Sequence, residues 1–218
     1  MLELTLSKQM GSIYSVLCLG SHCDDIEIGC GGTILTLIKK NRDIVFHWVI
    51  FSSDQQRKRE TNESANVFLK DAKKRKIVFR NFRNSFFPFT GSDIKEYFER
   101  LKRQFCPDLI FTHYRNDLHQ DHRLISELTW NTFRNHLILE YEIPKYDGDL
   151  GSPNVFVPLE ETICRKKIQY ILNSYKSQEK KKWFDQDTFL AILRLRGMES
   201  NAAERYAEAF YCRKIVLG

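Results

Sequence analysis

Two short segments of the chain concentrate histidine and aspartate side chains. The first is residues 21–25, Ser-His-Cys-Asp-Asp, and the second is residues 119–122, His-Gln-Asp-His. Imidazole nitrogens and carboxylate oxygens are ligands that zinc and similar divalent ions accept, and a catalytic zinc needs three protein ligands and one open position. Together the segments can supply three ligands and still leave a carboxylate and an imidazole for proton transfer.

The spacing within each segment narrows the candidate ligands. Adjacent Asp24 and Asp25 repel each other when both are ionised, and a bound cation relieves that repulsion. His22 and Asp25 are therefore plausible co-ligands, and the other aspartate could face the water that the ion activates. His119 and His122 are three residues apart, so they can share one side of a helical turn. Only one of these two imidazoles is needed as a ligand.

Each segment follows an apolar run that predicts a buried strand. One run covers residues 13–19 and the other covers residues 108–112. Helices and strands alternate between them, which predicts an α/β fold: a Rossmann-like three-layer sandwich with a mostly parallel sheet. Open parallel sheets bind ligands beyond the carboxyl ends of their strands, so we expect both segments to meet at an active site there.

The remaining predicted elements follow from hydrophobic periodicity and turn residues. Predicted helices cover residues 33–40, 57–70, 92–104, 124–136, 163–172 and 189–195. Predicted strands cover residues 44–51, 76–79 and 137–143. Residues 144–158 are predicted to be a turn-rich loop, and the C-terminus is predicted to be helical and then extended over residues 211–217. No repeat or linker divides the chain, so we expect one domain over residues 1–218.

A dinucleotide-binding loop is the rival interpretation of the glycine-rich residues 29–32. The G-x-G-x-x-G pattern would require glycine at position 34, which is Ile34. Polar residues 22–27 also occupy the turn where a pyrophosphate would lie. The glycines are better explained as allowing a helix to start close under the loop.

Composition excludes several classes of protein. Residues 1–20 lack the features of a secretory signal, and no apolar run approaches the ~20 residues of a membrane helix. The short apolar runs predict no membrane partner. The six cysteines are scattered, which predicts reduced thiols and a cytoplasmic location. The net charge is +6, but the basic run 176–182 resembles a solvated helix face and no nucleic-acid motif accompanies it. We therefore expect a small-molecule partner and no nucleic acid. The positive charge is compatible with a phosphorylated or nucleotide-linked small molecule. A homo-oligomer is also compatible with the sequence.

Two motifs resemble those of a known family. Residues 21–33, SHCDDIEIGCGGT, resemble the H-P-D-D-x-E-x-G-x-G-G-T opening of the zinc-dependent LmbE-like, or PIG-L, N-deacetylases. Residues 119–122 resemble the second signature of that family, H-P-D-H. The resemblance extends to residues 177–178 and to residues 196–211, so it spans almost the whole chain.

The chain departs from these motifs at Cys23 and Gln120, where the family usually has proline. Neither position is a ligand in the family, and every ionisable position of the pattern is intact. Because proline fixes φ, the substitutions loosen the local backbone. We expect them to affect loop rigidity rather than activity.

Carried over to this chain, the resemblance implies three zinc ligands, namely His22, Asp25 and His122. It implies that Asp24 is the general base and that His119 stabilises the oxyanion. Asp121 would orient the imidazole of His119, a role that carboxylates often have beside histidine. Iron(II) or another divalent ion is an alternative to Zn²⁺, because the same donors accept several metals.

Three further residues are expected to contact the substrate. Arg57, with Glu60 three residues later, resembles an Arg-x-x-Glu element of the family that faces the substrate; Arg59 is an alternative, and a surface ion pair would explain the spacing equally well. Lys145 lies in a polar loop, and Gln178 lies in the third region of resemblance.

The expected activity is removal of an acetyl group from an N-acetylated amino sugar or glycoconjugate precursor, with water activated by zinc attacking the amide. A nucleotide-sugar or nucleic-acid binding domain with a structural metal is the alternative from another class. The same site could also cleave an ester or an N-formyl group, which the sequence does not distinguish.

Overall fold

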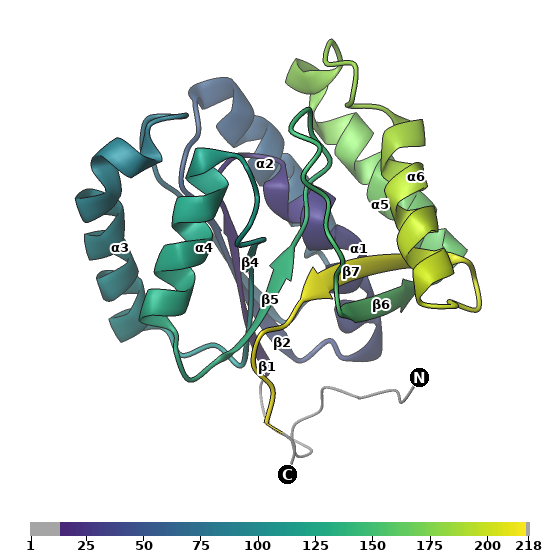
Figure 1. Cartoon of the computed structure of the whole chain (residues 1–218), viewed down its shortest axis with the longest axis horizontal. Coiled ribbons are helices and arrows are strands. Elements are labelled where there is room, and N and C mark those ends of the chain that lie inside the picture. The colour runs from purple at the N-terminus through teal and green to yellow at the C-terminus, as the bar shows by residue number, and fades with distance from the viewer. Residues whose placement is uncertain (1–13, 217–218) are drawn as a thin grey trace.

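The computed structural model describes residues 14–216, in which helices and strands alternate along most of the chain (Figure 1). The strands are β1 Tyr14–Gly20, β2 Ile44–Ile50, β3 Lys74–Phe79, β4 Leu109–His113, β5 Leu137–Tyr141, β6 Val155–Leu159 and β7 Tyr206–Tyr211. The α-helices are α1 Asp25–Lys40, α2 Gln55–Phe68, α3 Gly91–Gln104, α4 Gln120–Thr132, α5 Glu161–Ser174 and α6 Gln186–Glu199. Two short 3-10 helices are η1 Phe87–Thr90 and η2 Lys176–Gln178.

The described strands form a seven-stranded sheet in the order β3-β2-β1-β4-β5-β7-β6. Strands β3, β2, β1, β4 and β5 are parallel, whereas β7 is antiparallel to both β5 and β6. The chain passes from β1 to β2 on one side and later returns to β4 on the other side. This reversal creates a crevice beyond the carboxyl ends of β1 and β4.

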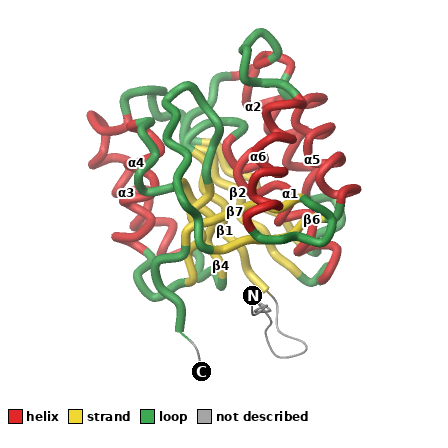
Figure 2. Tube along the Cα trace, turned by 45° about the vertical axis from the view of Figure 1, so that its right-hand side comes forward, coloured by secondary structure: helices red, strands yellow, loops and turns green. Residues whose placement is uncertain are grey.

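Helices cover both faces of the sheet (Figure 2). Helices α3 and α4 pack on one face, while α1, α2, α5 and α6 pack on the other. Successive strand residues face opposite sides, so Trp48 belongs to the core under α1 and α5 and Val49 to the core under α3 and α4. The predicted three-layer α/β sandwich with a mostly parallel sheet is confirmed.

No helix within residues 14–216 is long and apolar enough to cross a membrane. The prediction that residues 1–20 carry no secretory signal falls mostly on residues 1–13, which lie outside the described part of the chain.

Helix α1 begins at Asp25, eight residues before the predicted start at position 33, and contains the glycines that were expected to precede it. The glycines are tolerated because other parts of the fold occupy the space of their missing side chains. A Cβ atom on Gly29 would lie 2.2 Å from Cδ2 of Tyr141. Tertiary packing thus overrides the low helix propensity of glycine, which costs about 1 kcal/mol relative to alanine.

A buried ion pair, Glu208 with Lys167, hydrogen-bonds to the backbone of α1 next to these glycines. Glu208 of β7 accepts hydrogen bonds from Gly32 N (2.7 Å), Thr33 N (2.6 Å) and Lys167 Nζ (2.6 Å), and Lys167 also donates to Ile28 O (2.6 Å). In a regular α-helix Gly32 N and Ile28 O would bond to each other. The side chains of the ion pair therefore bond to backbone N–H and C=O groups of α1 just after the turn that carries Asp25.

Three other predictions of secondary structure are wrong: one helix start and the type of two segments. Helix α4 begins at Gln120 rather than residue 124, because the imidazole of His119 caps its first turn. The predicted loop 144–158 contains most of β6, in which Pro158 is accommodated because β6 is an edge strand. The helix predicted before residue 211 is β7, which is buried between β5 and β6 and so shows no alternating pattern.

The close approach of α1 and β5 predicts a large cost for Gly29→Ala. The added methyl group would overlap the Tyr141 ring, so we expect a loss of at least about 1–3 kcal/mol in the free energy of unfolding. Urea unfolding followed by circular dichroism measures this change.

Gly91→Ala is the matched control, since it also lies in a helix and its added Cβ would meet nothing nearer than 3.9 Å. We expect this variant to be as stable as the wild type or more stable by about 0.5–1 kcal/mol. Equal destabilisation of the two variants would contradict the close approach.

Candidate metal centre

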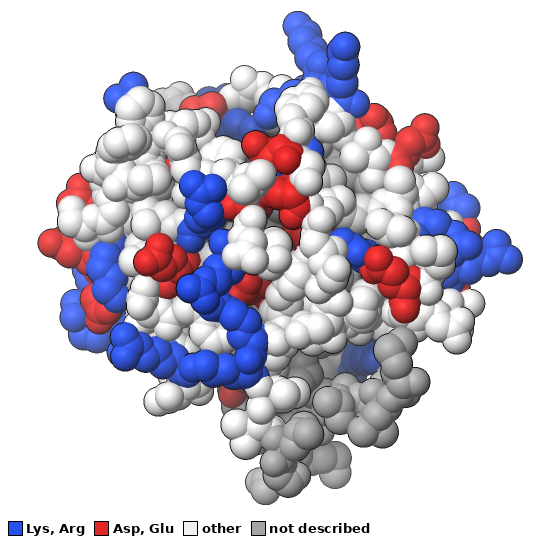
Figure 3. Space-filling view, viewed as in Figure 1, with Lys and Arg blue, Asp and Glu red and all other residues white. Residues whose placement is uncertain are grey.

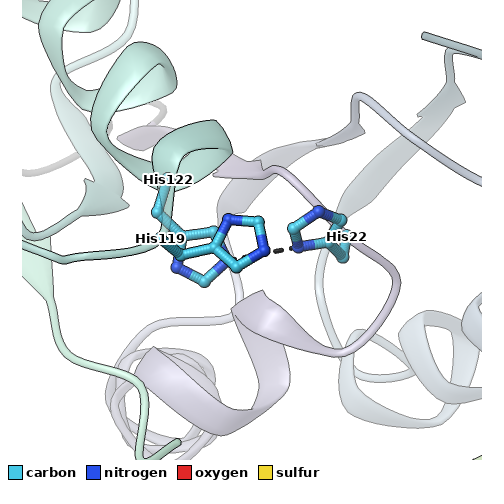
Figure 4. A group of neighbouring side chains, drawn as sticks. All are labelled: His22, His119 and His122. Atoms are coloured by element: carbon cyan, nitrogen blue, oxygen red, sulfur yellow. Dashed lines mark hydrogen bonds between the residues drawn. The ribbon is translucent and has the colours of Figure 1, made fainter. Parts of the chain in front are cut away.

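The crevice beyond β1 and β4 brings together three imidazoles from distant parts of the chain (Figure 4). His22 follows β1, whereas His119 and His122 lie at the start of α4. His22 Nδ1 is 3.2 Å from His122 Nε2, and the His119 ring centroid lies 4.9 Å and 4.5 Å from the centroids of His22 and His122. The parallel pairing of β1 with β4 produces this convergence.

The carboxylate of Asp25 lies beside two of these imidazoles. Its Oδ2 is 3.6 Å from His22 Nδ1, and its Oδ1 is 3.6 Å from His122 Nε2. The corners of a tetrahedron around an ion with bonds of about 2.1 Å lie about 3.4 Å apart. The separation of 3.2 Å between the two imidazole nitrogens, and of 3.6 Å between each nitrogen and an Asp25 oxygen, is close to this spacing.

His122 is common to two groups of neighbouring donors among the described residues. The donor atoms of His22, His119 and His122 lie within 4.8 Å of one another, and so do those of Asp25, His113 and His122. An ion in either group would require His122.

Asp117 fixes the orientation of His122. Its Oδ2 is 2.9 Å from His122 Nδ1, so Nε2 is left facing His22 and Asp25. Burial acts to raise the pKa of the Asp117 carboxyl, but His122, His113 and Lys145 together hold it well below its usual range. An ionised carboxylate on the outer nitrogen is a common partner of a metal-binding imidazole.

Asp121 was expected to orient His119, but in this structure its carboxylate contacts His22, and only its backbone N–H bonds to His119. Asp121 Oδ2 is 3.1 Å from His22 Nε2, and the same carboxylate accepts hydrogen bonds from Ser85 N (2.7 Å) and Phe87 N (3.1 Å). The backbone of Asp121, at the start of α4, directs its side chain towards the β1 loop. Asp121 therefore supports His22 in the way that Asp117 supports His122.

His119 takes an unusual position for a histidine, the N-cap of α4. Its Nδ1 accepts a hydrogen bond from Asp121 N at 3.2 Å, a role more often filled by serine, threonine, aspartate or asparagine. An accepting Nδ1 places the proton of the neutral ring on Nε2. His119 lines the cavity described below, so this donor is available to a bound molecule.

Asp24 is buried beside Arg57. Asp24 is 6% exposed, and its Oδ1 lies 2.7 Å from Arg57 Nη2. Burial raises the pKa of Asp24, while the charge of Arg57 acts in the opposite direction and that of Asp25 reinforces burial. A raised pKa suits a carboxylate that accepts a proton near neutral pH.

A cavity of about 570 Å³ opens over these groups. Its lining includes Arg57 and Lys145, two of the residues predicted to contact the substrate. Lys145 Nζ lies 2.9 Å from Asp117 and 2.5 Å from Asp149. Gln178 does not line the cavity; it is buried and its amide nitrogen donates to Ser177 Oγ. The geometry gives no support to a substrate contact by Gln178.

Glu60 does not form the surface ion pair with Arg57 that its spacing allowed. Its carboxylate accepts hydrogen bonds from Ser177 N (2.8 Å) and Ser177 Oγ (2.5 Å). Arg57 is thus left to face Asp24, and Glu60 ties α2 to η2.

Four residues near the site were not among the predicted functional residues. His113 and Asp117 lie at the carboxyl end of β4, as the HQDH segment does. Because ligands bind beyond the carboxyl ends of parallel strands, these two residues could have been predicted from the sequence. His113 is fully buried, and its Nε2 lies 3.2 Å from Asp25 Oδ2. Lys181 and Trp183 line the cavity from the loop after η2, where the sequence carries no comparable signal.

Residues 17–133 match the family described as PIG-L: GlcNAc-PI de-N-acetylase. The chain belongs to this family. The match contains both the segment with His22 and the segment with His122, and PIG-L proteins are the family that the sequence motifs indicated.

Solved structures with the same fold include proteins of different activity. An N,N'-diacetylchitobiose deacetylase from Pyrococcus horikoshii is 23% identical, with 91% of this chain and 83% of that chain covered and a TM-score of 0.64. Teicoplanin deacetylase in a zinc-inhibited form is 13% identical, with 91% and 97% covered and a TM-score of 0.69. A 4-carboxy-2-hydroxymuconate hydratase from Pseudomonas putida is 14% identical, with 94% and 98% covered and a TM-score of 0.70. At these identities the likeness shows the fold alone.

The shared position of His122 predicts that His122→Ala abolishes tight binding of a divalent ion. We expect one equivalent of Zn²⁺ or Co²⁺ to bind the wild type and raise its Tm. The variant should bind the ion at least about 100-fold more weakly. Mutation of residues that only hydrogen-bond to a metal ligand already lowers metal affinity by about 10- to 100-fold, and His122 is a proposed ligand itself. Competition with a metal-sensitive dye gives the affinity.

His136→Ala is the control, because His136 lies outside both donor groups. It should keep the wild-type affinity. Undiminished metal binding by His122→Ala would contradict the location of the site.

Proposed function

We propose that this protein is a divalent-metal-dependent deacetylase of N-acetylated amino sugars or glycoconjugate precursors, with His22, Asp25 and His122 as the metal ligands. The observation that carries the proposal is the cluster of His22 Nδ1, His122 Nε2 and the Asp25 carboxylate at the cavity, in which the two nitrogens are 3.2 Å apart and each lies 3.6 Å from an oxygen of Asp25. Membership of the PIG-L family supports deacetylation, and the relative named for diacetylchitobiose supports an acetylated sugar.

The competing group with His113 is less suited to hold the ion. His113 Nε2 accepts a hydrogen bond from Ser21 N at 3.0 Å and lies 3.3 Å from the Tyr141 hydroxyl, so its lone pair already has partners. His22 Nδ1 and His122 Nε2 instead face each other and Asp25. A divalent ion bound among them would polarise the acetyl carbonyl and lower the pKa of a water molecule.

Zinc or iron(II) is compatible with this donor set, because both accept imidazole and carboxylate ligands. The teicoplanin deacetylase structure is described as zinc-inhibited, so the metal must be tested separately in each protein.

Asp24 is positioned to act as general base. It lines the cavity next to Asp25 and is the N-cap residue of α1, where its carboxylate can take a proton from water in the crevice. Arg57, 2.7 Å away, opposes the rise in the pKa of this carboxyl group that burial causes. After the amide bond breaks, the protonated Asp24 can return its proton to the leaving amine.

His119 is positioned to stabilise the oxyanion. Because its Nδ1 accepts the Asp121 amide, Nε2–H remains to donate a hydrogen bond inside the cavity. A single donor of this kind contributes about 2.7–4 kcal/mol to transition-state stabilisation in other acyl-transfer enzymes.

The experiment is an acetate-release assay over a panel of N-acetylated amino sugars, with protein loaded separately with Zn²⁺, Fe²⁺ and Co²⁺. Asp24→Asn should lower kcat by about 10²- to 10⁴-fold and still bind the metal, since removal of a general base affects the proton transfer. Asp43→Asn, which alters an exposed carboxylate paired with Lys73, should keep wild-type kcat.

Ester and N-formyl analogues in the same panel distinguish the bond that is cleaved. If metal-loaded wild type released no acyl group from any compound, the binding-domain alternative would replace the proposal. Wild-type activity in Asp24→Asn would remove Asp24 as the base.

A further inference from the structure

Three basic side chains line the cavity, and two of them are already paired with carboxylates. Arg57 lies 2.7 Å from Asp24, and Lys145 lies 2.9 Å from Asp117 and 2.5 Å from Asp149. Their charges therefore support the proposed catalytic centre. They are not free to neutralise a charge on the substrate.

Lys181, the third basic residue, is exposed at the cavity rim. Within residues 14–216 its ammonium group has no carboxylate at ion-pair distance, although its charge acts at longer range to lower the pKa of Asp24. The Trp183 ring lies beside it, with its centroid 5.6 Å from Nζ. Charged groups of both signs are interspersed over the face in Figure 3, so net charge alone indicates no anion site. The indication comes instead from the cation of Lys181 in the cavity lining, which forms no ion pair among the described residues.

The wall that carries Lys181 is a fixed part of the fold. Tyr175 donates a hydrogen bond to Glu27 on α1 (2.5 Å), and Ser177 bonds to Glu60 on α2. Lys181 N donates to Gln178 O at 2.9 Å, and Phe184 N donates to Lys181 O at 3.0 Å. The backbone of Lys181 is therefore tied to the two helices that carry Asp25 and Arg57.

Trp183 presents a rigid aromatic face beside this cation. Its ring meets the buried rings of Phe184 and Phe189 edge-on, with centroid distances of 5.6 and 6.4 Å, and it is half-buried in the cavity lining. Aromatic rings in binding sites stack on planar or apolar faces, while a neighbouring ammonium group binds anionic oxygens.

We propose that Lys181 and Trp183 form a subsite for a phosphate ester carried by the acetylated substrate, with Lys181 binding the phosphate oxygens. The inference rests on the proposed function and narrows its substrate class to phosphorylated or nucleotide-linked acetamido sugars. The cavity volume, about 570 Å³, lies within the ~300–1,000 Å³ that holds drug-sized ligands, which leaves room beyond the acetamido group.

Two acidic groups in the lining do not occupy this position. Asp54 caps α2 by accepting a hydrogen bond from Arg57 N at 2.8 Å, so its charge faces the helix amides. Asp147 is exposed on the loop after β5, on a different segment from Lys181.

The test compares kcat/KM for a neutral N-acetylhexosamine, its 1-phosphate and its uridine diphosphate ester. The wild type should prefer a phosphorylated compound by roughly 10- to 100-fold, as expected for a charge-assisted hydrogen bond. In Lys181→Met the ratio of phosphorylated to neutral kcat/KM should fall towards one, mainly through KM. The 1-phosphate and the diphosphate arms show which phosphate ester the subsite accepts.

Lys180→Met and Lys182→Met are matched controls, since both remove one charge from the same run and neither residue lines the cavity. They should keep the wild-type preference. An unchanged preference in Lys181→Met would overturn the inference, because the phosphate would then be bound elsewhere, for example directly by the metal. A wild type that prefers the neutral sugar would also overturn it.

Binding of the sugar 1-phosphate, measured by calorimetry on metal-loaded protein, separates this inference from the proposed function. If no compound is deacetylated, the proposed function fails, and the calorimetry still decides the subsite. Loss of affinity for the sugar 1-phosphate in Lys181→Met, but not in the two control variants, supports the subsite. Equal affinity in all variants contradicts it.

Discussion

The site depends on the contact between the β1 loop and the start of α4, where His22 Nδ1 and His122 Nε2 lie 3.2 Å apart. Each imidazole is held from behind by a carboxylate, His22 by Asp121 and His122 by Asp117. These outer bonds leave the inner nitrogens facing Asp25. Such a concentration of imidazoles and carboxylates is costly to bury unless their charges are compensated, and a divalent cation is a direct compensation.

Helix α1 must bring Asp25 into this contact from the other side of the sheet. Glycine at position 29 allows the helix to lie against Tyr141, and the Tyr141 hydroxyl in turn bonds to Leu19 O at the end of β1. The ion pair of Lys167 and Glu208 takes up the backbone groups that follow the first turn. Strand β7 and helix α5 thus help to hold the start of α1, and with it Asp25, in place. Both elements lie outside the matched family region.

The sequence predicted those features that depend on local pattern and on sheet topology. Apolar runs before His22 and before His119 located the two strand ends, and their convergence follows from parallel neighbours in the sheet. The start of α1 was missed because the fit of Gly29 against Tyr141 depends on a residue more than a hundred positions away. The family resemblance implied that Asp121 orients its neighbour His119, whereas its carboxylate contacts His22. Lys181 and Trp183 enter the cavity only through the packing of η2 against α2, which no local pattern encodes.

The most direct test of this account is a crystal structure with a bound divalent ion, the metal being identified by anomalous scattering. We expect one ion at about 2.0–2.2 Å from His22 Nδ1, His122 Nε2 and a carboxylate oxygen of Asp25, with Asp24 and His119 beside its open position. An ion held instead by His113, Asp117 and His119 would contradict the account.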